Sequence, residues 1–310
     1  MITAVDDVSF DVAPGERLAI VGESGSGKTI TALSILRLIP EPPGRIAGGK
    51  ILFEGKNLLD LNPGAIRSLR GGSIAMIFQE PMSSLNPVFT IGSQIIEALT
   101  LHQGIRGAAA RKRAIEMLAL VKIASPERRI DNYPHELSGG MRQRAMIAMA
   151  LASRPKLLIA DEPTTALDVT VQAQILQLMS DLQREFGMAI VLITHDLGVV
   201  AEFAERIIVM YAGKIVESAS VAAAFADPLH PYTTGLINSM PPLDRDLAVL
   251  PTIEGVVPPP HAFPKGCRFH PRCSYARAPC TEHIPPLLEL RPDHRTACIR
   301  HIDYRSPPNV

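Results

Sequence analysis

The sequence predicts an α/β fold with a mainly parallel sheet. Three apolar runs, at 17–21, 156–160 and 188–194, have the length and composition of buried strands. Stretches with helical periodicity, such as 108–122, alternate with them, as expected when parallel strands are joined by crossovers. Because the first two strands lie much further apart than one crossover requires, we expect an inserted helical subdomain at about 83–150.

Two regions of the 310-residue chain differ in composition. The segment 228–310 holds 16 of the 27 prolines and all four cysteines. Prolines interrupt helices and sheets, so this segment would struggle to build a core from side chains alone. We therefore predict a main domain at 1–227 and a small, loop-rich cysteine domain at 228–310.

Charge and hydropathy narrow the function classes. Lysine plus arginine equals aspartate plus glutamate at 31 each, so no global field favours nucleic acid as a partner. No apolar run approaches the roughly 20 residues that span a bilayer. The start of the chain lacks the basic and apolar pattern of a signal peptide. We expect a cytosolic chain whose membrane contacts run through partner proteins.

A phosphate-binding loop follows the first strand. Its residues fit the pattern G-x-x-x-x-G-K-[ST]: Gly22, Glu23, Ser24, Gly25, Ser26, Gly27, Lys28 and Thr29. The glycines let backbone N–H groups turn toward a β-phosphate, and a helix predicted at 31–39 points its positive end at the same anion. Lys28 would contact the β- and γ-phosphates, and the Thr29 hydroxyl would bind Mg²⁺. The loop predicts an ATP and Mg²⁺ site.

Four more polar residues stand at strand ends, where ligands of open α/β sheets bind. Asp161 is suited to hold Mg²⁺, and Glu162 to polarise the attacking water. His195 could donate to the γ-phosphate, and Gln79, after a strand predicted at 73–78, could meet both Mg²⁺ and the water. Alternatively, Asp161 caps a helix, Glu162 is a surface charge and His195 is a turn residue. Convergence on the phosphate loop favours the catalytic interpretation.

A glycine-rich sequence opens a strongly apolar helix that ends near residue 152. Ser138 is suited as its N-cap, while Gly139 and Gly140 leave the helix N-terminus open to an anion. We also assign Gln143 to this binding set. By itself the pattern is better explained by an ordinary capped and buried helix.

Taken together, these motifs resemble the ATPase cassette of ABC transporters, in that family's order, over about residues 2–220. The resemblance implies a phosphate-loop NTPase with a RecA-like sheet core. It also implies that Ser138, Gly139 and Gly140 cover the ATP bound by a second ATPase subunit. By the same resemblance, Asp168, in the run Ala166-Leu167-Asp168, would help to join the two halves.

Three further segments, at 78–87, 133–136 and 230–233, resemble the oligopeptide/dipeptide (and nickel) importer subfamily. That resemblance implies ATP-driven import of di- or oligopeptides at the cytoplasmic face of the bacterial inner membrane. The expected partners are a second, paralogous ATPase, two transmembrane permeases and, indirectly, a solute-binding protein. Alternatives are nickel or another small solute as cargo, a soluble ABC ATPase of DNA repair or translation, and a regulator without turnover.

The four cysteines form one local group of Cys267, Cys273, Cys280 and Cys298. Disulfides are rare in the cytosol, and four thiolates are enough for one metal or cluster site. The subfamily resemblance implies a structural [4Fe–4S] cluster; zinc and free thiols are the alternatives. His270, His283 and His294 lie near enough for a mixed ligand set.

Members of the family normally begin with a further strand and an aromatic residue that stacks on adenine. This sequence begins with Met1 and Ile2 at a point after both features. Either the natural start lies further upstream, which is the alternative we favour, or the protein lacks an edge strand and binds adenine weakly.

Overall fold

The computed structural model describes residues 2–79, 84–165, 167–241 and 252–301. Ala166 and residues 80–83, which carry part of the predicted motifs and the start of the predicted helical subdomain, lie outside the described residues. The chain forms two compact units. The first comprises 1–11, 17–33 and 193–310, and the second comprises 12–16 and 34–192. The boundary at 227 and the helical subdomain remain predictions.

The first unit is built on strand β1 (Arg17–Val21), which coincides with the predicted strand. It pairs in parallel with β7 (Arg206–Tyr211), with Val21 opposite Val209. The chain then turns back through β8 (Lys214–Ser220), which pairs antiparallel with β7.

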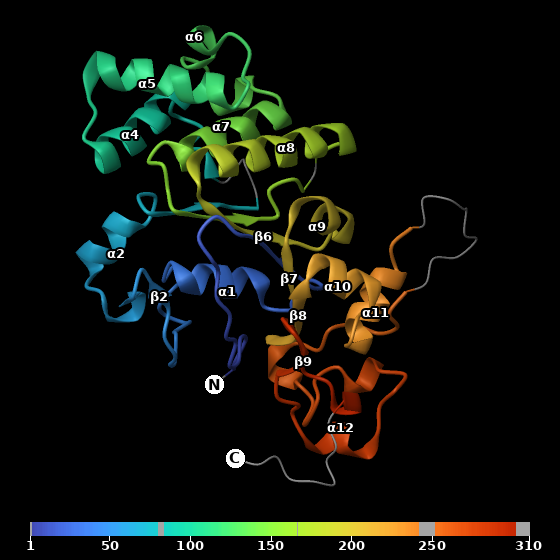
Figure 1. Ribbon diagram of the computed structural model, residues 1–310. Coiled ribbons are helices and arrows are strands. Elements are labelled where there is room, and N and C mark those ends of the chain that lie inside the picture. The colour runs from blue at the N-terminus through green and yellow to red at the C-terminus, as the bar shows by residue number, and fades with distance from the viewer. Residues whose placement is uncertain (1, 80–83, 166, 242–251, 302–310) are drawn as a thin grey trace. The chain divides into compact units, whose positions relative to one another are not determined.

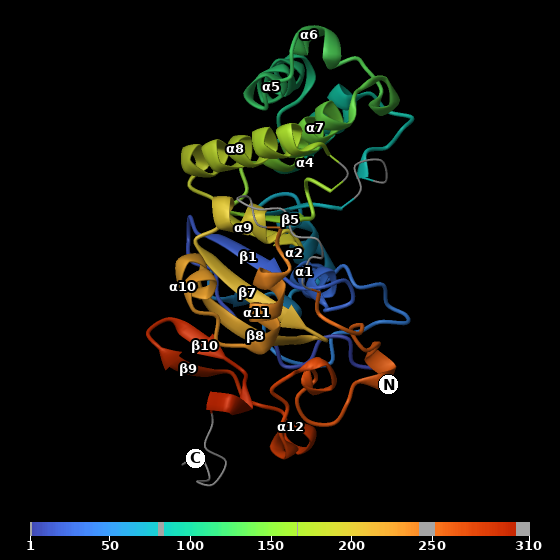
Figure 2. The same ribbon diagram turned by 90° about the vertical axis from the view of Figure 1, so that its right-hand side faces the viewer.

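Two strands from the proline-rich tail extend this sheet. Strand β10 (His294–Thr296) pairs antiparallel with β8, and β9 (Leu288–Arg291) pairs antiparallel with β10 (Figure 2). The sheet is therefore mixed, whereas the sequence predicted a mainly parallel one. The added strands were missed because they are short and follow a run of prolines, which disfavours sheet structure.

Short helices complete the first unit. They are α1 (Lys28–Ile35), which begins in this unit, α9 (Leu197–Phe203), α10 (Val221–Ala226), α11 (Pro231–Asn238), α12 (Ala278–Glu282) and the 3-10 turns η3 (Pro260–Ala262), η4 (His270–Arg272) and η5 (Ile299–His301). Helix α1 begins three residues before the predicted 31–39, because the phosphate loop passes directly into its first turn.

The tail shares the core of the first unit. Phe269, only 4% exposed, packs edge-on against Tyr211 of β7 with ring centroids 5.1 Å apart. Tyr232 of α11 lies 4.7 Å from Tyr211, also edge-on. Such contacts add to the free energy gained by burying the aromatic surface. The tail therefore obtains its apolar contacts from β7, so the proline-rich composition does not leave it without a core.

A buried glutamate fastens the tail to β8. Glu217 is fully buried and accepts hydrogen bonds from the backbone N–H groups of Leu229 and His230, both at 2.8 Å. Its carboxylate also lies 2.7 Å from Nε2 of His294 on β10. A buried carboxylate is costly unless it is fully hydrogen-bonded. These contacts of Glu217 therefore hold the start of α11 and strand β10 of the tail against β8.

The second unit contains strands β4 (Ile74–Ile77) and β5 (Leu157–Asp161), which pair in parallel with Ile77 opposite Ala160. Strand β6 (Ala189–Thr194), whose first four residues belong to this unit, follows β5 in the sheet order. All three strands were predicted to within two residues at each end. A small antiparallel ribbon, β2 (Leu52–Phe53) with β3 (Lys56–Asn57), was not predicted.

Helices dominate the second unit, where α4, α5 and α7 pack against one another (Figure 1). The helices are α2 (Pro63–Leu69), α4 (Ile91–Gln103), α5 (Gly107–Leu120), α6 (Pro126–Arg129), α7 (Gly139–Leu151), α8 (Val169–Phe186) and the 3-10 turns η1 (Leu58–Asp60) and η2 (Pro134–Glu136). The predicted helices near 108–122 and 138–152 are confirmed. Within the described ranges, no helix combines the length and apolar character needed to cross a membrane.

The buried His230 predicts a pH dependence of stability. Burial, together with nearby His301, lowers the pKa of His230 to about 3. Below about pH 6.5 the unfolded chain binds a proton that the folded imidazole does not, so stability falls by up to about 1.4 kcal/mol per pH unit. We expect His230→Asn, which keeps a capping acceptor, to lose less unfolding free energy between pH 7 and pH 5.5 than the wild type. Urea unfolding at the two pH values measures both losses of unfolding free energy. Equal losses in His230→Asn and the wild type would contradict the assignment of this pH dependence to His230.

Candidate nucleotide site

The phosphate loop holds its lysine in the first unit. Lys28, at the start of α1 and 6% exposed, donates hydrogen bonds to the carbonyl oxygens of Gly22 at 2.7 Å and Glu23 at 3.1 Å. Ser24 and Thr29 are exposed at the same loop. The ammonium group thus lies across the loop, with hydroxyl groups beside it, as a phosphate site requires.

The loop approaches the turn between β7 and β8 very closely. A Cβ atom on Gly22, whose φ is +150°, would lie 2.2 Å from the carbonyl oxygen of Met210. A Cβ atom on Gly27 would lie 3.3 Å from Cα of Gly213, whose N–H donates to the carbonyl of Ser26 at 2.8 Å. At Gly22 the neighbouring backbone leaves no room for a side chain, and at Gly27 the φ of +99° is one that residues with a side chain rarely adopt.

Glu23, the second residue of the loop, is tied to the tail. Its backbone N–H donates to the Tyr232 hydroxyl at 2.8 Å. Its carboxylate accepts from Nη1 of Arg272, at 2.9 Å to one oxygen and 3.1 Å to the other. Burial raises the pKa of Tyr232, which keeps its hydroxyl neutral. Sequence reasoning missed both partners, which lie 209 and 249 residues away along the chain.

The second unit brings Gln79 and Glu162 together, as the strand ends predicted. Nε2 of Gln79 donates to Oε2 of Glu162 at 2.9 Å, and the Thr165 hydroxyl donates to the same oxygen at 2.9 Å. The register explains the meeting, because Ile77 pairs with Ala160 and each polar residue lies two positions further on. Thr165 was not predicted, although it follows the two carboxylates closely in the sequence.

Asp161 and His195 also stand at strand ends. Asp161 is the last residue of β5 and is 2% exposed. The alternative of Asp161 as a helix cap is wrong, because α8 is capped by Asp168. His195 directly follows β6 and is exposed, while the next residue, Asp196, caps α9. His195 and the phosphate loop belong to the first unit; Gln79, Asp161 and Glu162 belong to the second.

The N-terminus of α7 has the predicted form. Ser138 is its N-cap, and the Ser138 hydroxyl accepts from the backbone N–H of Met141 at 3.4 Å. Ser138 and Gly139 are exposed, which leaves the positive end of the helix open to an anion. A Cβ atom on Gly140 would lie 2.9 Å from Cγ1 of Val171 on α8. Gly140 therefore lets two helices approach.

Two other assigned residues serve the fold. The Asp168 carboxylate accepts from the backbone N–H of Val171 at 2.9 Å and so begins α8. Gln143 is only 1% exposed, since α7 packs against β4. The nucleotide role of Gln143 and the joining role of Asp168 stay predictions.

The four cysteines are free thiols on one segment of the first unit. The Cys267 N–H donates to the carbonyl of Cys280 at 2.9 Å. Burial, with smaller contributions from the other three thiols, raises the pKa of Cys267 to about 11. The parts of this segment that carry the four cysteines therefore lie close together. Among the residues that the structure describes, no group of three or more His, Cys, Asp or Glu side chains is arranged to hold a metal ion.

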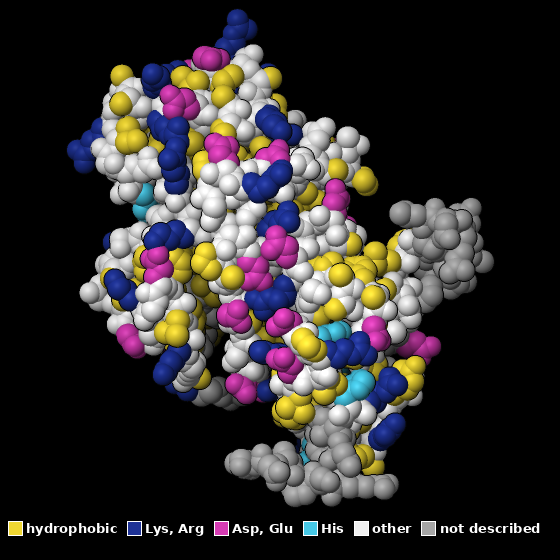
Figure 3. All heavy atoms as spheres, viewed as in Figure 1, with side chains coloured by type: hydrophobic (Ala, Val, Ile, Leu, Met, Phe, Trp, Pro, Cys, Tyr) yellow, Lys and Arg dark blue, Asp and Glu magenta, His cyan; other side chains and the backbone are white. Residues whose placement is uncertain are grey.

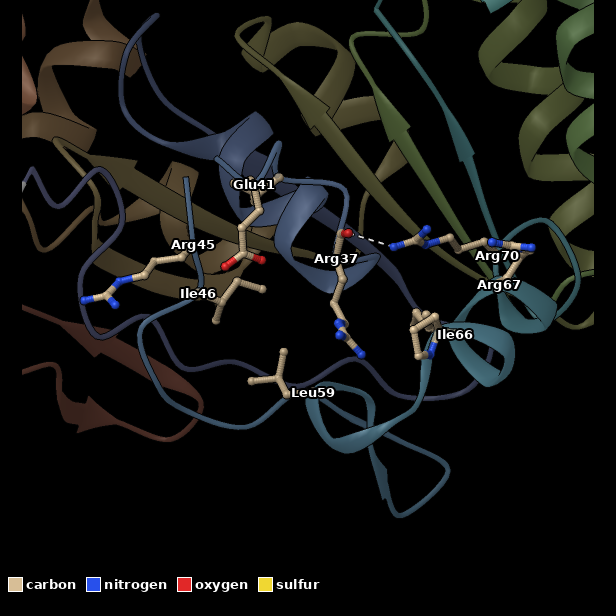
Figure 4. A pocket seen from close by; sticks show the side chains of 10 residues that line it. Arg37, Glu41, Arg45, Ile46, Leu59, Ile66, Arg67 and Arg70 are labelled. Carbon is tan, nitrogen blue, oxygen red and sulfur yellow. Dashed lines mark hydrogen bonds between the residues drawn. The ribbon is translucent and has the colours of Figure 1, made fainter. Parts of the chain in front are cut away.

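A cavity of about 320 Å³ in the second unit is lined by arginines (Figure 4). Two of them bind backbone. Arg37 donates to the carbonyl of Leu61 at 2.6 Å, and Arg70 donates to the carbonyls of Leu36 and Arg37, both at 2.7 Å. Burial and the neighbouring guanidinium groups of Arg37 and Arg67 lower the pKa of Arg70. Arg37 and Arg70 thus hold the segment that follows α1.

A second hollow, of about 400 Å³, has mostly apolar walls in the same unit. It is lined by Met76, Ile77, Phe78, Ser84, Met146 and Met149. Strand β4 supplies the first two residues and leads directly to Gln79. Any group seated in this hollow would therefore lie against the strand that positions Gln79.

Comparisons with known proteins identify the family. Residues 5–165 match the family model described as ABC transporter, and residues 216–280 match the oligopeptide/dipeptide transporter C-terminal region. The chain belongs to the ABC transporter ATP-binding family, whose members hydrolyse ATP to power transport.

Curated relatives match almost the whole chain. A probable peptide ABC transporter ATP-binding protein of Sinorhizobium fredii is 57% identical, over 96% of this chain and 89% of its own. The oligopeptide transport ATP-binding protein AppD of Bacillus subtilis is 52% identical over the same shares. Among solved structures, the cassette MJ0796, a dimer in a post-hydrolysis state bound to ADP and Pi, is similar with a TM-score of 0.63. It is 32% identical, over 71% of this chain and 91% of its own.

The two signature glycines predict different responses to alanine. Gly140→Ala should cost about 1–3 kcal/mol of unfolding free energy, because its methyl group would press on Val171, whose branched side chain is stiff in a helix. Gly139→Ala meets Leu167 only at 3.7 Å and should be neutral or stabilising by up to about 1 kcal/mol. Urea unfolding of both variants provides the comparison; equal effects would show that the contact with Val171 is unimportant.

Proposed function

We propose that this chain is the ATP-hydrolysing subunit of an ABC importer for di- or oligopeptides. The observation that supports peptides as the cargo is the match of residues 216–280 to the oligopeptide/dipeptide transporter C-terminal region. Relatives named as peptide transport ATPases support it over nearly the full chain. Nickel or another small solute is the alternative cargo for the same motor.

ATP binding begins at the phosphate loop. Lys28 exchanges the carbonyls of Gly22 and Glu23 for the β- and γ-phosphates, since an ammonium gains more from phosphate than from neutral acceptors. The oxygens of Thr29, Asp161 and Gln79 suit Mg²⁺, which prefers hard oxygen ligands. When bound, Mg²⁺ neutralises phosphate charge. The buried Asp161 at the end of β5 supports this assignment.

Glu162 acts on the attacking water. Gln79 and Thr165, both neutral donors, bind one carboxylate oxygen, which fixes the side chain's direction. We assign the carboxylate of Glu162 to the attacking water, which the carboxylate would orient and deprotonate. His195, exposed after β6, donates to the γ-phosphate as charge develops there.

The partner ATPase completes the site. The exposed Ser138 and Gly139 at the positive end of α7 are suited to cover the γ-phosphate held by another subunit. The dimeric state of the similar cassette MJ0796 supports pairing. The subfamily resemblance favours a paralogue as the second ATPase, with Asp168 helping to join the halves.

Two permeases would receive the conformational change that accompanies ATP binding and hydrolysis. A solute-binding protein would act through these permeases. The apolar hollow at β4 and α7 supports a contact near Gln79, where nucleotide binding is sensed. The chain would then lie at the cytoplasmic face of the bacterial inner membrane. A nucleic-acid partner finds no support, because side chains of both signs are intermixed on the face shown in Figure 3 and the net charge is zero.

Glu162→Gln tests the motor in the assembled transporter. We expect ATP binding to remain near normal, while turnover and peptide uptake fall by about 10²–10⁴-fold, because the base is lost but the shape is kept. The ATP-bound, paired form should accumulate, as measured by nucleotide retained after gel filtration. Glu185→Gln on the exposed side of α8 is the control. Near-normal hydrolysis by Glu162→Gln would reject the role of this carboxylate.

We also propose a structural [4Fe–4S] cluster on Cys267, Cys273, Cys280 and Cys298. Four thiols in one loop-rich segment, where the N–H of Cys267 donates to the carbonyl of Cys280 at 2.9 Å, supply the number of thiolate ligands that such a cluster needs. The cluster would supply cross-links to a segment of short turns.

Metal analysis of anaerobically purified protein tests the cluster. We expect about four iron and four sulfide per chain, with visible absorbance that is lost in Cys280→Ser. Ser274→Ala, beside Cys273, should leave the iron content unchanged. Zinc without sulfide, or no metal at all, would overturn the iron–sulfur assignment.

A further inference from the structure

The phosphate loop carries a negative charge of its own. The Glu23 carboxylate is 30% exposed, and its partner, the Arg272 side chain, is only 5% exposed. Nη1 of Arg272 bridges both carboxylate oxygens, at 2.9 and 3.1 Å. A residue of the proline- and cysteine-rich tail therefore neutralises an acidic residue inside the loop that is to bind a polyanion.

Arg272 is held in place by groups other than Glu23. Its Nε donates to the carbonyl of Glu254 at 2.8 Å, and its Nη2 donates to the carbonyl of Ile253 at 3.0 Å. The guanidinium carbon also lies 5.8 Å from the centre of the Tyr211 ring, in cation–π range. The positive charge is thus pre-positioned by the tail and by β7, and the Glu23 carboxylate contacts it there.

Glu23 cannot easily withdraw its charge from the loop. Its backbone N–H donates to the hydroxyl of Tyr232 at 2.8 Å, a contact that does not involve Lys28. This contact fixes the residue's backbone within the loop. Without Arg272, the carboxylate would remain beside the bound triphosphate as an uncompensated negative charge, and like charges at such distances repel strongly where water is partly excluded.

We propose that Arg272 is a positioning residue for ATP binding, which holds and neutralises the Glu23 carboxylate so that the phosphate loop can accept ATP. The tail then contributes to nucleotide affinity. The inference rests on the proposed nucleotide site at Lys28. The competing explanation is that the ion pair only fastens the tail to the first unit, in which case the charge on Glu23 is of no consequence for ATP.

A charge series separates the two explanations. The pair carries no net charge in the wild type, one negative charge in Arg272→Ala, one positive charge in Glu23→Gln, and none in the double variant. If repulsion matters, Arg272→Ala weakens ATP binding by about tenfold, and adding Glu23→Gln restores it to within about threefold of the wild type. Glu23→Gln alone binds ATP at least as tightly as the wild type.

The measurement is equilibrium binding of Mg·ATP to the full chain, together with KM and kcat of the assembled transporter. KM should rise in Arg272→Ala while kcat changes little, and higher salt should reduce the difference. Arg291→Ala is the matched control, because Arg291 forms an exposed ion pair with Asp227 in the same unit, at 2.6 Å. It should bind ATP like the wild type.

The outcomes decide between the explanations. Wild-type affinity in Arg272→Ala overturns the proposal, as does equal weakening in Arg272→Ala and the double variant. If Arg272→Ala is poorly folded, Arg272→Lys keeps a cation at the carboxylate and should bind ATP within about threefold of the wild type. A loss of about tenfold or more in Arg272→Lys would reject the charge argument. Failure of the wild type to bind ATP would reject the nucleotide site itself.

Discussion

The close approach of Gly22 to the carbonyl oxygen of Met210 is the constraint on which the first unit depends. Parallel pairing of β1 with β7 sets Val21 opposite Val209, so the loop must leave β1 directly against the next residue of β7. Only a residue without a side chain fits there. The same strand, β7, packs through Tyr211 against the tail. Strand β7 therefore both constrains the phosphate loop, through Met210, and packs against the tail, through Tyr211.

Much of the fold follows from the pattern of apolar residues. The strands at 17–21, 157–161 and 189–194 are largely apolar, and nearly all of their residues are buried in the sheet. Strands β9 and β10 carry no such signal. Their side chains are mostly polar, and they form because β8 offers an edge and Glu217 captures His294. Such long-range causes leave no local trace in the sequence.

The contacts of the candidate site also divide into those that the sequence predicts and those that it does not. The meeting of Gln79 with Glu162 was predictable, since parallel strands in register bring their following residues together. The contacts of Glu23 were not, because the motif assigns that position no chemistry and its partners lie in the tail. Tyr232 belongs to a segment singled out by family resemblance, but its hydroxyl's contact with the loop depends on how α11 packs against β7.

The two glutamates of the proposed site show how environment separates identical side chains. Glu162 is oriented by neutral donors, the amide of Gln79 and the hydroxyl of Thr165, which direct the carboxylate without cancelling its charge. Glu23 is bridged by a buried guanidinium, which cancels its charge beside the anion site. A base needs its negative charge to attract a proton from water, whereas a phosphate loop functions best without one. A site that hydrolyses a polyanion therefore requires a carboxylate that keeps its charge, as Glu162 does, and a loop carboxylate whose charge is cancelled, as that of Glu23 is.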